Sequence, residues 1–423
     1  MGRLCTALQV VGTLRPNTTV YVPGMTGESL SFLRALQASP ERAEDVRFVG
    51  VHFPSVNRSD YLGIHPRARQ RAYFMSPLSR DGIAQGRVEI VPLDYPGAFR
   101  DLQATDIDLA VLQVSPPDER GMCSTGICCD FHPAVWASAR RRILHINPAL
   151  PRTRSSFSVP FAECDGAFEE QSELVTFDSG IVDDTMMQHA RLVASQIRDG
   201  DVLEFGIGKL QAAVLAALRN HRRLRVWSGM ASEPIVQLLD SGTISGRDSI
   251  EIGVALGSSS FYDRVGRDEA FYFRPVSETH DVRRMMDIEN FCAINSAVEV
   301  DLFGQINADM AGGRLIAGVG GLPAFASAGI LAPRGRSIIA LPATTADGKA
   351  SRIVAHLGNE SLCAIPRHGA DRVITEYGIA SLKGLSVHAR AEALISISAP
   401  RFRNELAQAW AGIAARLITS GQV

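Results

Sequence analysis

Residues 201–234 read DVLEFGIGKLQAAVLAALRNHRRLRVWSGMASEP, and this stretch decides the fold. Residues 202–205 are typical of a strand, and the glycines at 206–208 predict a tight turn at its carboxyl end. The run 210–218 is rich in Ala and Leu, which favour a helix. Because unpaired backbone N–H groups point out of a helix start, a strand, a glycine turn and a helix together favour binding of a phosphate or carboxylate.

A second strand is predicted at 224–227, and it is expected to carry residues 228–233 out as a loop beside the glycine turn. Ligands of parallel sheets bind in the crevice beyond the carboxyl ends of adjacent strands. We therefore expect the functional site at this edge, with the rest of the chain as its frame.

The remaining sequence alternates strands and helices, which predicts parallel sheets with helices on their faces. The clearest strand is 107–114, a nearly continuous apolar run that is expected of a strand buried on both faces. Residues 148–185 are poor in strand signals and are interpreted as a connection. Further strands are expected at 19–22, 46–53, 88–91, 143–147 and 337–341, and helices at 29–36, 134–142 and, with an interruption near Pro400, 387–417.

The length of 423 residues suggests two domains. The strand patterns of the second half follow those of the first in the same order, which indicates either a duplicated domain or only the general alternation of α/β chains. The predicted fold class is therefore α/β, with two similar open parallel-sheet domains that carry helices on both faces, at residues 1–185 and 186–423.

Composition excludes several functions. A net charge of −2 argues against a general nucleic-acid binder, and no apolar run approaches the length of a membrane span. The seven cysteines lack zinc-ligand spacing and fit a reducing cytoplasm, and Cys123, Cys128 and Cys129 are interpreted as packed thiols. We expect a cytoplasmic protein with no metal site, no nucleic-acid partner and no membrane partner.

Glycine-rich segments are the strongest chemical signals. The pair Gly206 and Gly208 is a weak dinucleotide motif, because Gln211 stands where the third glycine belongs. Residues 318–321, Gly-Val-Gly-Gly, can bring backbone N–H groups close to a ligand or an oxyanion, although a simple tight turn is the alternative. Lys349 lies in a polar loop and suits either a phosphate contact or solvent.

The chain resembles the acetyl-CoA hydrolase/transferase family, which includes 4-hydroxybutyrate, butyrate and acetate CoA-transferases. The resemblance covers nearly the whole chain. The segments that carry it are 114–118 with 121–124, 147–153, 205–208, 293–307, 318–321, 351–354 and 375–378.

This resemblance implies two similar α/β domains with the active site between them, and it favours a homodimer. It implies that a glutamate attacks the acyl-CoA thioester and then carries the coenzyme A as a glutamyl thioester. It further implies coenzyme A contacts from Gly206, Ile207, Gly208, Lys209 and Leu210, from Gly318, Gly320 and Gly321, and from Lys349.

One departure concerns the nucleophile. The family glutamate stands in a motif like Trp/His-Ser/Thr-Glu-Met, and here residues 227–230 place Gly229 at that position. A glycine has no nucleophilic side chain, so the other catalytic candidates are Glu233, four residues on, and Glu28, in the glycine turn of the first half. Direct reaction of the two substrates in a shared pocket is a further alternative.

Three hypotheses follow. The chain is a CoA-transferase that moves coenzyme A between an acyl-CoA and a small carboxylic acid, or an acyl-CoA hydrolase that uses the same pocket with water as acceptor. The third hypothesis is a degenerate protein that binds coenzyme A without turnover. A nicotinamide-dependent function is disfavoured by the incomplete glycine motif.

Overall fold

The computed structural model describes residues 3–418 and divides into two compact units. Among these residues, the first unit comprises 3–179, 226–233 and 245–281, and the second comprises 180–225, 234–244 and 282–418. Each unit is therefore built from separate stretches of the sequence. The domain boundary near residue 185 stays a prediction.

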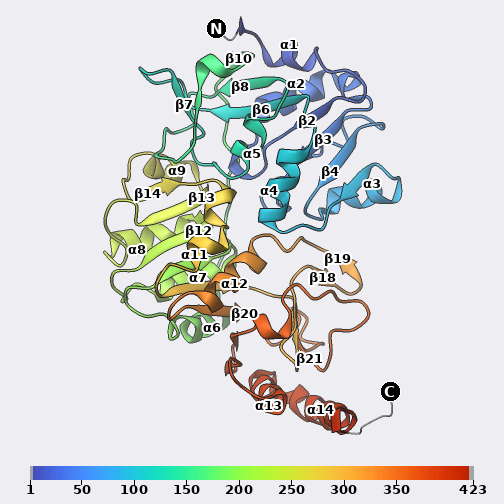
Figure 1. Cartoon of the computed structure of the whole chain (residues 1–423), viewed down its shortest axis with the longest axis vertical. Coiled ribbons are helices and arrows are strands. Elements are labelled where there is room, and N and C mark those ends of the chain that lie inside the picture. The colour runs from blue at the N-terminus through green and yellow to red at the C-terminus, as the bar shows by residue number, and fades with distance from the viewer. Residues whose placement is uncertain (1–2, 419–423) are drawn as a thin grey trace. The chain divides into compact units, whose positions relative to one another are not determined.

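The first unit contains an eight-stranded sheet in which all neighbouring strands are parallel. Its central strand β6 (Leu109–Val114) is buried along its whole length, as its apolar sequence predicted. Figure 1 shows β6 beside β8 and β2. The strand order is β1 (Arg3–Leu4), β10 (Gly166–Glu169), β8 (Arg142–Ile146), β6, β2 (Thr19–Tyr21), β3 (Arg47–Gly50), β4 (Arg69–Ala72) and β5 (Val88–Ile90).

Helices cover both faces of this sheet. Side chains of β6 alternate between two apolar clusters: Leu109 and Val111 pack with helix α2 (Leu30–Ala38), while Leu112 and Val114 pack with helix α4 (Tyr95–Ala104). This period of two is what a strand between two helical layers requires. The other helices and the small hairpin strands of this region are α1 (Ala7–Val11), α3 (Arg80–Ala84), α5 (His132–Trp136), β7 (Met122–Ser124) and β9 (Ser158–Pro160).

The first unit also holds a parallel block of three strands in the order β14 (Phe271–Phe273), β13 (Ile250–Leu256) and β12 (Arg225–Ser232). Helices α9 (Ser259–Val265) and α10 (Val276–Thr279) follow β13 and β14 along the chain. Strand β13 is buried along its whole length.

The second unit contains a five-strand block that is parallel except at its last pair. The strand order is β11 (Val202–Phe205), β15 (Phe291–Asn295), β20 (Arg336–Ala340), β22 (Arg372–Thr375) and β23 (Gly378–Ser381). Its helices include the terminal pair, which lie together in Figure 1. They are α6 (Asp184–Ala194), α7 (Lys209–Ala217), α8 (Val236–Asp240), α11 (Val282–Met285), α12 (Leu322–Leu331), α13 (Val387–Ile397) and α14 (Arg403–Ile418).

Short strands complete the second unit. Strand β16 pairs antiparallel with β17 and parallel with β21, and β18 and β19 form a hairpin. Their bounds are β16 (Glu299–Asp301), β17 (Ile306–Asn307), β18 (Met310–Ala311), β19 (Arg314–Leu315) and β21 (Ile353–Val354).

The α/β fold class is confirmed, and three local predictions are wrong. The helix predicted at 134–142 begins at His132 and ends at Trp136. The connection at 148–185 contributes strands β9 and β10. The loop predicted from residue 228 is instead part of β12, which continues to Ser232 because β13 pairs with it as far as Leu256.

A buried ion pair generates a stability prediction. Asp201 stands before β11, and its carboxylate accepts a hydrogen bond from the guanidinium of Arg336, the first residue of β20. Both side chains are at most 3% exposed. Replacement Asp201→Ala leaves a buried unpaired guanidinium and is expected to cost about 3–5 kcal/mol of unfolding free energy, measured by denaturant or thermal unfolding.

The matched control is Glu289→Ala, which removes an ion pair with Arg334 in which both side chains are about 60% exposed. Solvent screening limits such pairs to about 1 kcal/mol or less. Equal losses of unfolding free energy in the two variants would contradict the conclusion that breaking the buried ion pair costs more than breaking the exposed one.

Candidate functional site

Glu28, in the first unit, lies in a turn that directly follows strand β2. The turn needs glycine at its start, because a Cβ at Gly24 would lie 1.8 Å from the carbonyl oxygen of Val51. The Glu28 side chain is 1% exposed. Its two carboxylate oxygens accept hydrogen bonds from Asn57 Nδ2 at 2.9 Å and from the hydroxyl of Tyr61 at 3.0 Å. Glu28 is thus a buried acid with both oxygens engaged by protein donors.

Glu233 follows strand β12 and is also engaged. Its Oε2 accepts the backbone N–H of Ser258 at 2.9 Å, and its Oε1 accepts the Ser258 hydroxyl at 2.9 Å. Ser258 is the N-cap of helix α9 and in turn accepts the backbone N–H of Phe261. The Glu233 carboxylate therefore fixes the start of a helix.

Gly229 is buried inside β12. The parallel register pairs Ser228 with Ile252 and Met230 with Val254, so Gly229 stands opposite Gly253 of β13. Residues paired in this way project from the same face of a parallel sheet. Gly229 itself offers only backbone groups to any reaction at that face.

Asp130 is a carboxylic acid that the sequence analysis missed. A Cβ at Gly253 would lie 3.4 Å from Asp130 Oδ1 and 2.8 Å from the carbonyl oxygen of Gly229. Asp130 is 5% exposed, and burial raises the pKa of its carboxyl to about 8. No general motif contains this residue. The only local signal is an acid directly after two buried cysteines.

The three cysteines near this acid are packed, as predicted. Cys123, Cys128 and Cys129 are at most 2% exposed. Burial raises the pKa of the Cys123 thiol to about 11 and that of Cys129 to about 12, and it also raises the pKa of Cys128. Thiols that stay protonated near neutral pH are poor nucleophiles, so these cysteines are poor candidates for a nucleophile.

The second unit holds the glycine turn after β11. Gly208 has a φ of 111°, a conformation that favours glycine, and it caps helix α7 without a side-chain hydrogen bond. Strand β15 lies beside β11, and Phe205 pairs with Ile294. Gln211 of α7 donates a hydrogen bond to Ser296 Oγ at 2.9 Å. The turn at 206–208 and the end of β15 thus share one carboxyl edge, where ligands of parallel sheets bind.

The segment Gly318–Gly321 immediately precedes helix α12, which packs against strands β15 and β20 of the second unit. Gly320 has a φ of 58°, and Gly321 is the N-cap residue. A helix start of this kind presents backbone N–H groups to an anion. Lys349 has an 85% exposed side chain, 3.9 Å from Asp347 Oδ2. The coenzyme A contacts of these residues stay predictions.

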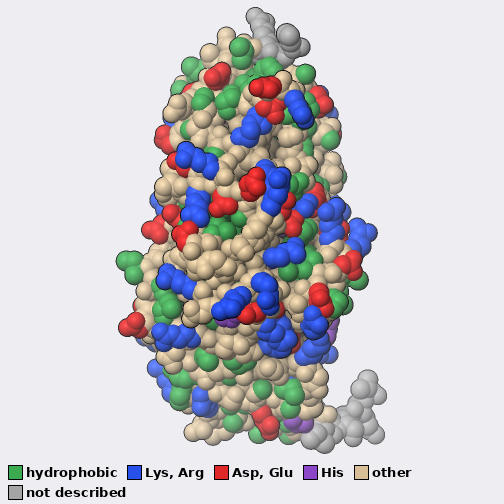
Figure 2. All heavy atoms as spheres, turned by 90° about the vertical axis from the view of Figure 1, so that its left-hand side faces the viewer, with side chains coloured by type: hydrophobic (Ala, Val, Ile, Leu, Met, Phe, Trp, Pro, Cys, Tyr) green, Lys and Arg blue, Asp and Glu red, His purple; other side chains and the backbone are tan. Residues whose placement is uncertain are grey.

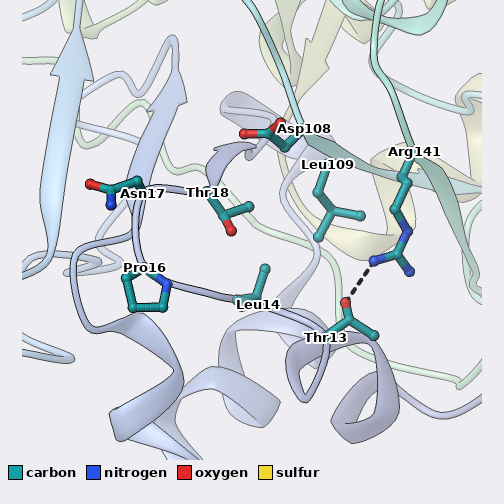
Figure 3. A pocket seen from close by; sticks show the side chains of 8 residues that line it. All are labelled: Thr13, Leu14, Pro16, Asn17, Thr18, Asp108, Leu109 and Arg141. Carbon is teal, nitrogen blue, oxygen red and sulfur yellow. Dashed lines mark hydrogen bonds between the residues drawn. The ribbon is translucent and has the colours of Figure 1, made fainter.

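A pocket of about 300 Å³ lies elsewhere in the first unit. Figure 3 shows it, with Arg141 donating a hydrogen bond to Thr13 Oγ1 at 2.9 Å. It is located where β2 and β6 begin, at the amino edge of the sheet and away from the carboxyl edge that binds ligands. Its lining residues are Thr13, Leu14, Pro16, Asn17, Thr18, Asp108, Leu109 and Arg141.

The surface in Figure 2 carries Lys and Arg side chains interspersed with Asp and Glu side chains. Between residues 3 and 418, no group of three or more His, Cys, Asp or Glu residues could hold a metal ion. Within the same range, every helix is too short or too polar to cross a membrane.

An α/β fold with glycine turns and buried acids at the carboxyl ends of its strands is typical of enzymes that bind a ligand at that edge. Family comparison makes the class specific. Residues 3–179 match the acetyl-CoA hydrolase/transferase N-terminal domain, and residues 257–410 match the C-terminal domain of the same family.

Individual proteins give the same result. The chain is 30% identical to the 4-hydroxybutyrate coenzyme A transferase of Clostridium kluyveri over 96% of both chains. It is 33% identical to the butyryl-CoA:acetate CoA-transferase of Anaerostipes caccae over 79% of both. The crystal structure of RipA from Yersinia pestis superposes with a TM-score of 0.89, at 26% identity, over 97% of this chain and 98% of that one. The chain belongs to the acetyl-CoA hydrolase/transferase family.

Glu204 of β11 generates a prediction about pH. Its buried carboxyl accepts a hydrogen bond from Asn295 Nδ2 at 2.7 Å, and burial raises its pKa from 4.5 to about 8. Between these two values the folded chain holds a proton that the unfolded chain releases, so this group stabilises the fold at low pH and its contribution falls as pH rises. Replacement Glu204→Gln is expected to remove a slope of about 1.4 kcal/mol per pH unit from the unfolding free energy in that window.

The measurement is denaturant unfolding at several pH values from 5 to about 8 for both proteins. Parallel stability profiles for wild type and Glu204→Gln would contradict the assignment.

Proposed function

We propose that this chain transfers coenzyme A between an acyl-CoA thioester and a small carboxylic acid. The observation that carries the proposal is the match along 96% of the chain to a 4-hydroxybutyrate coenzyme A transferase. The chain matches both the N-terminal and the C-terminal domain of the family, so the similarity is not limited to one domain. The substrates are an acyl-CoA and a free carboxylate, and no metal takes part.

Two glycine segments of the second unit are the proposed coenzyme A contacts. Residues 206–210 and residues 318–321 each lead into a helix, α7 and α12. Backbone N–H groups at helix starts suit phosphate groups and a developing oxyanion. Lys349 is a further proposed phosphate contact, which its exposed ammonium group suits.

Three positions bear on the identity of the nucleophile: Gly229, Glu28 and Glu233. Gly229 has no side chain, and the carboxylates of Glu28 and Glu233 each accept two hydrogen bonds from protein groups. Hydrogen bonds to a carboxylate stabilise its charge and reduce its reactivity toward a carbonyl carbon. Either glutamate would have to exchange these bonds before it could attack.

Hydrolysis of acyl-CoA is the second candidate function, because the family includes hydrolases as well as transferases. The absence of a side chain at Gly229 is the specific observation that favours it, since a glycine leaves room for an attacking water. A protein that only binds coenzyme A remains the third candidate.

We also propose a homodimer in the cytoplasm. The resemblance to the family supports the homodimer, and size-exclusion chromatography with light scattering tests it. A reducing compartment is supported by the described cysteines, all of which are free thiols.

The activity prediction is direct. Purified protein mixed with butyryl-CoA and acetate is expected to form acetyl-CoA and butyrate, followed by liquid chromatography of the CoA esters. Transfer requires the acceptor acid, whereas hydrolysis releases free coenzyme A without it. Release of free coenzyme A alone would favour the hydrolase, and no turnover with several acyl-CoA and acid pairs would contradict both enzymatic functions.

Restoring an acid at residue 229 is a second test. Replacement Gly229→Glu places a carboxylate on the same strand position where the family carries its glutamate, so the rate of transfer is expected to rise. Replacement Gly229→Gln has the same size without the charge and is the matched control. An equal rate in both variants would contradict the positional match.

A further inference from the structure

The backbone around Asp130 is anchored to strand β13. Cys129 N–H donates to the carbonyl oxygen of Gly253 at 2.9 Å, and Ala255 N–H donates to that of Ile127 at 2.9 Å. On its other side, the carbonyl oxygen of Asp130 accepts the N–H of Val276 at 2.9 Å. These bonds hold the residue beside the carboxyl half of β13.

The carboxyl of Asp130 is unlike those of Glu28 and Glu233. Within residues 3–418, no protein donor hydrogen-bonds to it, and burial is the whole cause of its raised pKa. Its backbone φ of 30° is unusual for a residue with a side chain. A buried acid without a hydrogen bond, held in an uncommon conformation, costs stability and is typical of functional sites.

The sheet register places this carboxyl on the face to which residue 229 would point. A Cβ at Gly253 would be directed to within 3.4 Å of Asp130 Oδ1. Gly229 is the register partner of Gly253 on the next strand, so a side chain at residue 229 would project from the same face. Strands are separated by about 4.8 Å, which is within the reach of a glutamate side chain.

We propose that Asp130 supplies the carboxylate nucleophile that Gly229 lacks. The inference rests on the proposed transferase function and names the residue that carries its covalent step. Asp130 first releases its proton to solvent; an oxygen of the resulting carboxylate then attacks the acyl carbonyl carbon, a C–O bond forms, the C–S bond breaks, and coenzyme A leaves as the thiolate. The product is a mixed anhydride of Asp130 and the acyl group.

The next steps return the enzyme to its starting state. Coenzyme A thiolate attacks the Asp130 carbonyl carbon of the anhydride, which releases the donor acid and leaves an aspartyl thioester. The acceptor carboxylate then attacks that thioester to form a second anhydride, and the thiolate takes its acyl group to give the new acyl-CoA and free Asp130. No oxidant, reductant or metal enters the balance. Poor solvation of the carboxylate increases its reactivity once it is ionised.

The experiment traps the thioester. Wild-type protein is mixed with butyryl-CoA, reduced with borohydride, digested and mapped by mass spectrometry. Reduction of an aspartyl thioester yields homoserine, so homoserine is expected at residue 130. Replacement Asp130→Asn is expected to abolish the adduct and to lower kcat for transfer on the order of a thousandfold or more, as removal of a nucleophile does.

The double variant Asp130→Asn with Gly229→Glu tests the shared face. It is expected to regain transfer relative to Asp130→Asn and to carry the adduct at residue 229. The matched control is Asp45→Asn, an aspartate of the same unit with a φ of 53° whose carboxylate pairs with Arg67 at the surface. Its rate is expected to equal that of wild type.

Each contrary result has a distinct meaning. An adduct at Glu28 or Glu233, or full transfer by folded Asp130→Asn, overturns the role of Asp130 and leaves the transferase function standing. Transfer by wild type without any adduct also overturns the role of Asp130 and leaves the transferase function standing, and it indicates that the two substrates react directly. Absence of transfer in wild type overturns the proposed function, and the inference with it.

Discussion

Backbone pairing of residues 127–129 with β13 is the interaction on which the first unit's candidate site depends. Strand β14 pairs with β13 only at residues 250–252, and residues 127–129 then pair with β13 from 253 to 255. The Thr26 hydroxyl joins the same place, within hydrogen-bond distance of the carbonyl oxygens of Ile127 and Ala255. Segments near residues 128 and 254 are thereby held together through backbone groups, which do not depend on side-chain identity, and the Thr26 side chain adds the third segment.

This arrangement buries the Asp130 carboxyl, which costs free energy of folding. A carboxyl taken out of water without a hydrogen bond shifts its pKa upward instead of staying charged, and this occurs at Asp130. The neighbouring acids avoid that cost differently: Glu28 uses Asn57 and Tyr61, and Glu233 uses Ser258. Structural acids are satisfied by donors, whereas a reactive acid must be free to meet a substrate.

The sequence predicted the fold where local pattern and tertiary context agree. Residues 202–205 and 109–114 are strands both in the sequence prediction and in the structure. The predicted break near Pro400 separates helix α13 from helix α14. Prediction was wrong where pairing with a distant strand overrides local preference. The helix expected to reach Arg142 ends early, because Arg140 N–H and Arg141 N–H bond to the carbonyls of Ile107 and Asp108 and lead into β8. Strand β10 is likewise specified by β8.

The candidate site depends even more on pairing between distant segments, which the local sequence does not predict. Glycine turns at 206–208 and before α12 were visible in the sequence because glycine marks backbone conformation directly. Asp130 was not visible, since its proposed role depends on the register between strands β12 and β13, which lie far from it in the sequence. Sequence alone also placed Gly229 in a loop, where a side chain would have no defined direction, whereas strand β12 gives that position a definite face.

That definite face bears on the glutamate that the family resemblance implies at residue 229. In a loop, replacement of a nucleophile by glycine removes a reactive group and leaves nothing in its place. In a parallel strand paired with Gly253, it removes a side chain from a surface that a second carboxyl already borders at 3.4 Å from the Gly253 Cβ position. If Asp130 acts as proposed, covalent transfer is compatible with a glycine at residue 229.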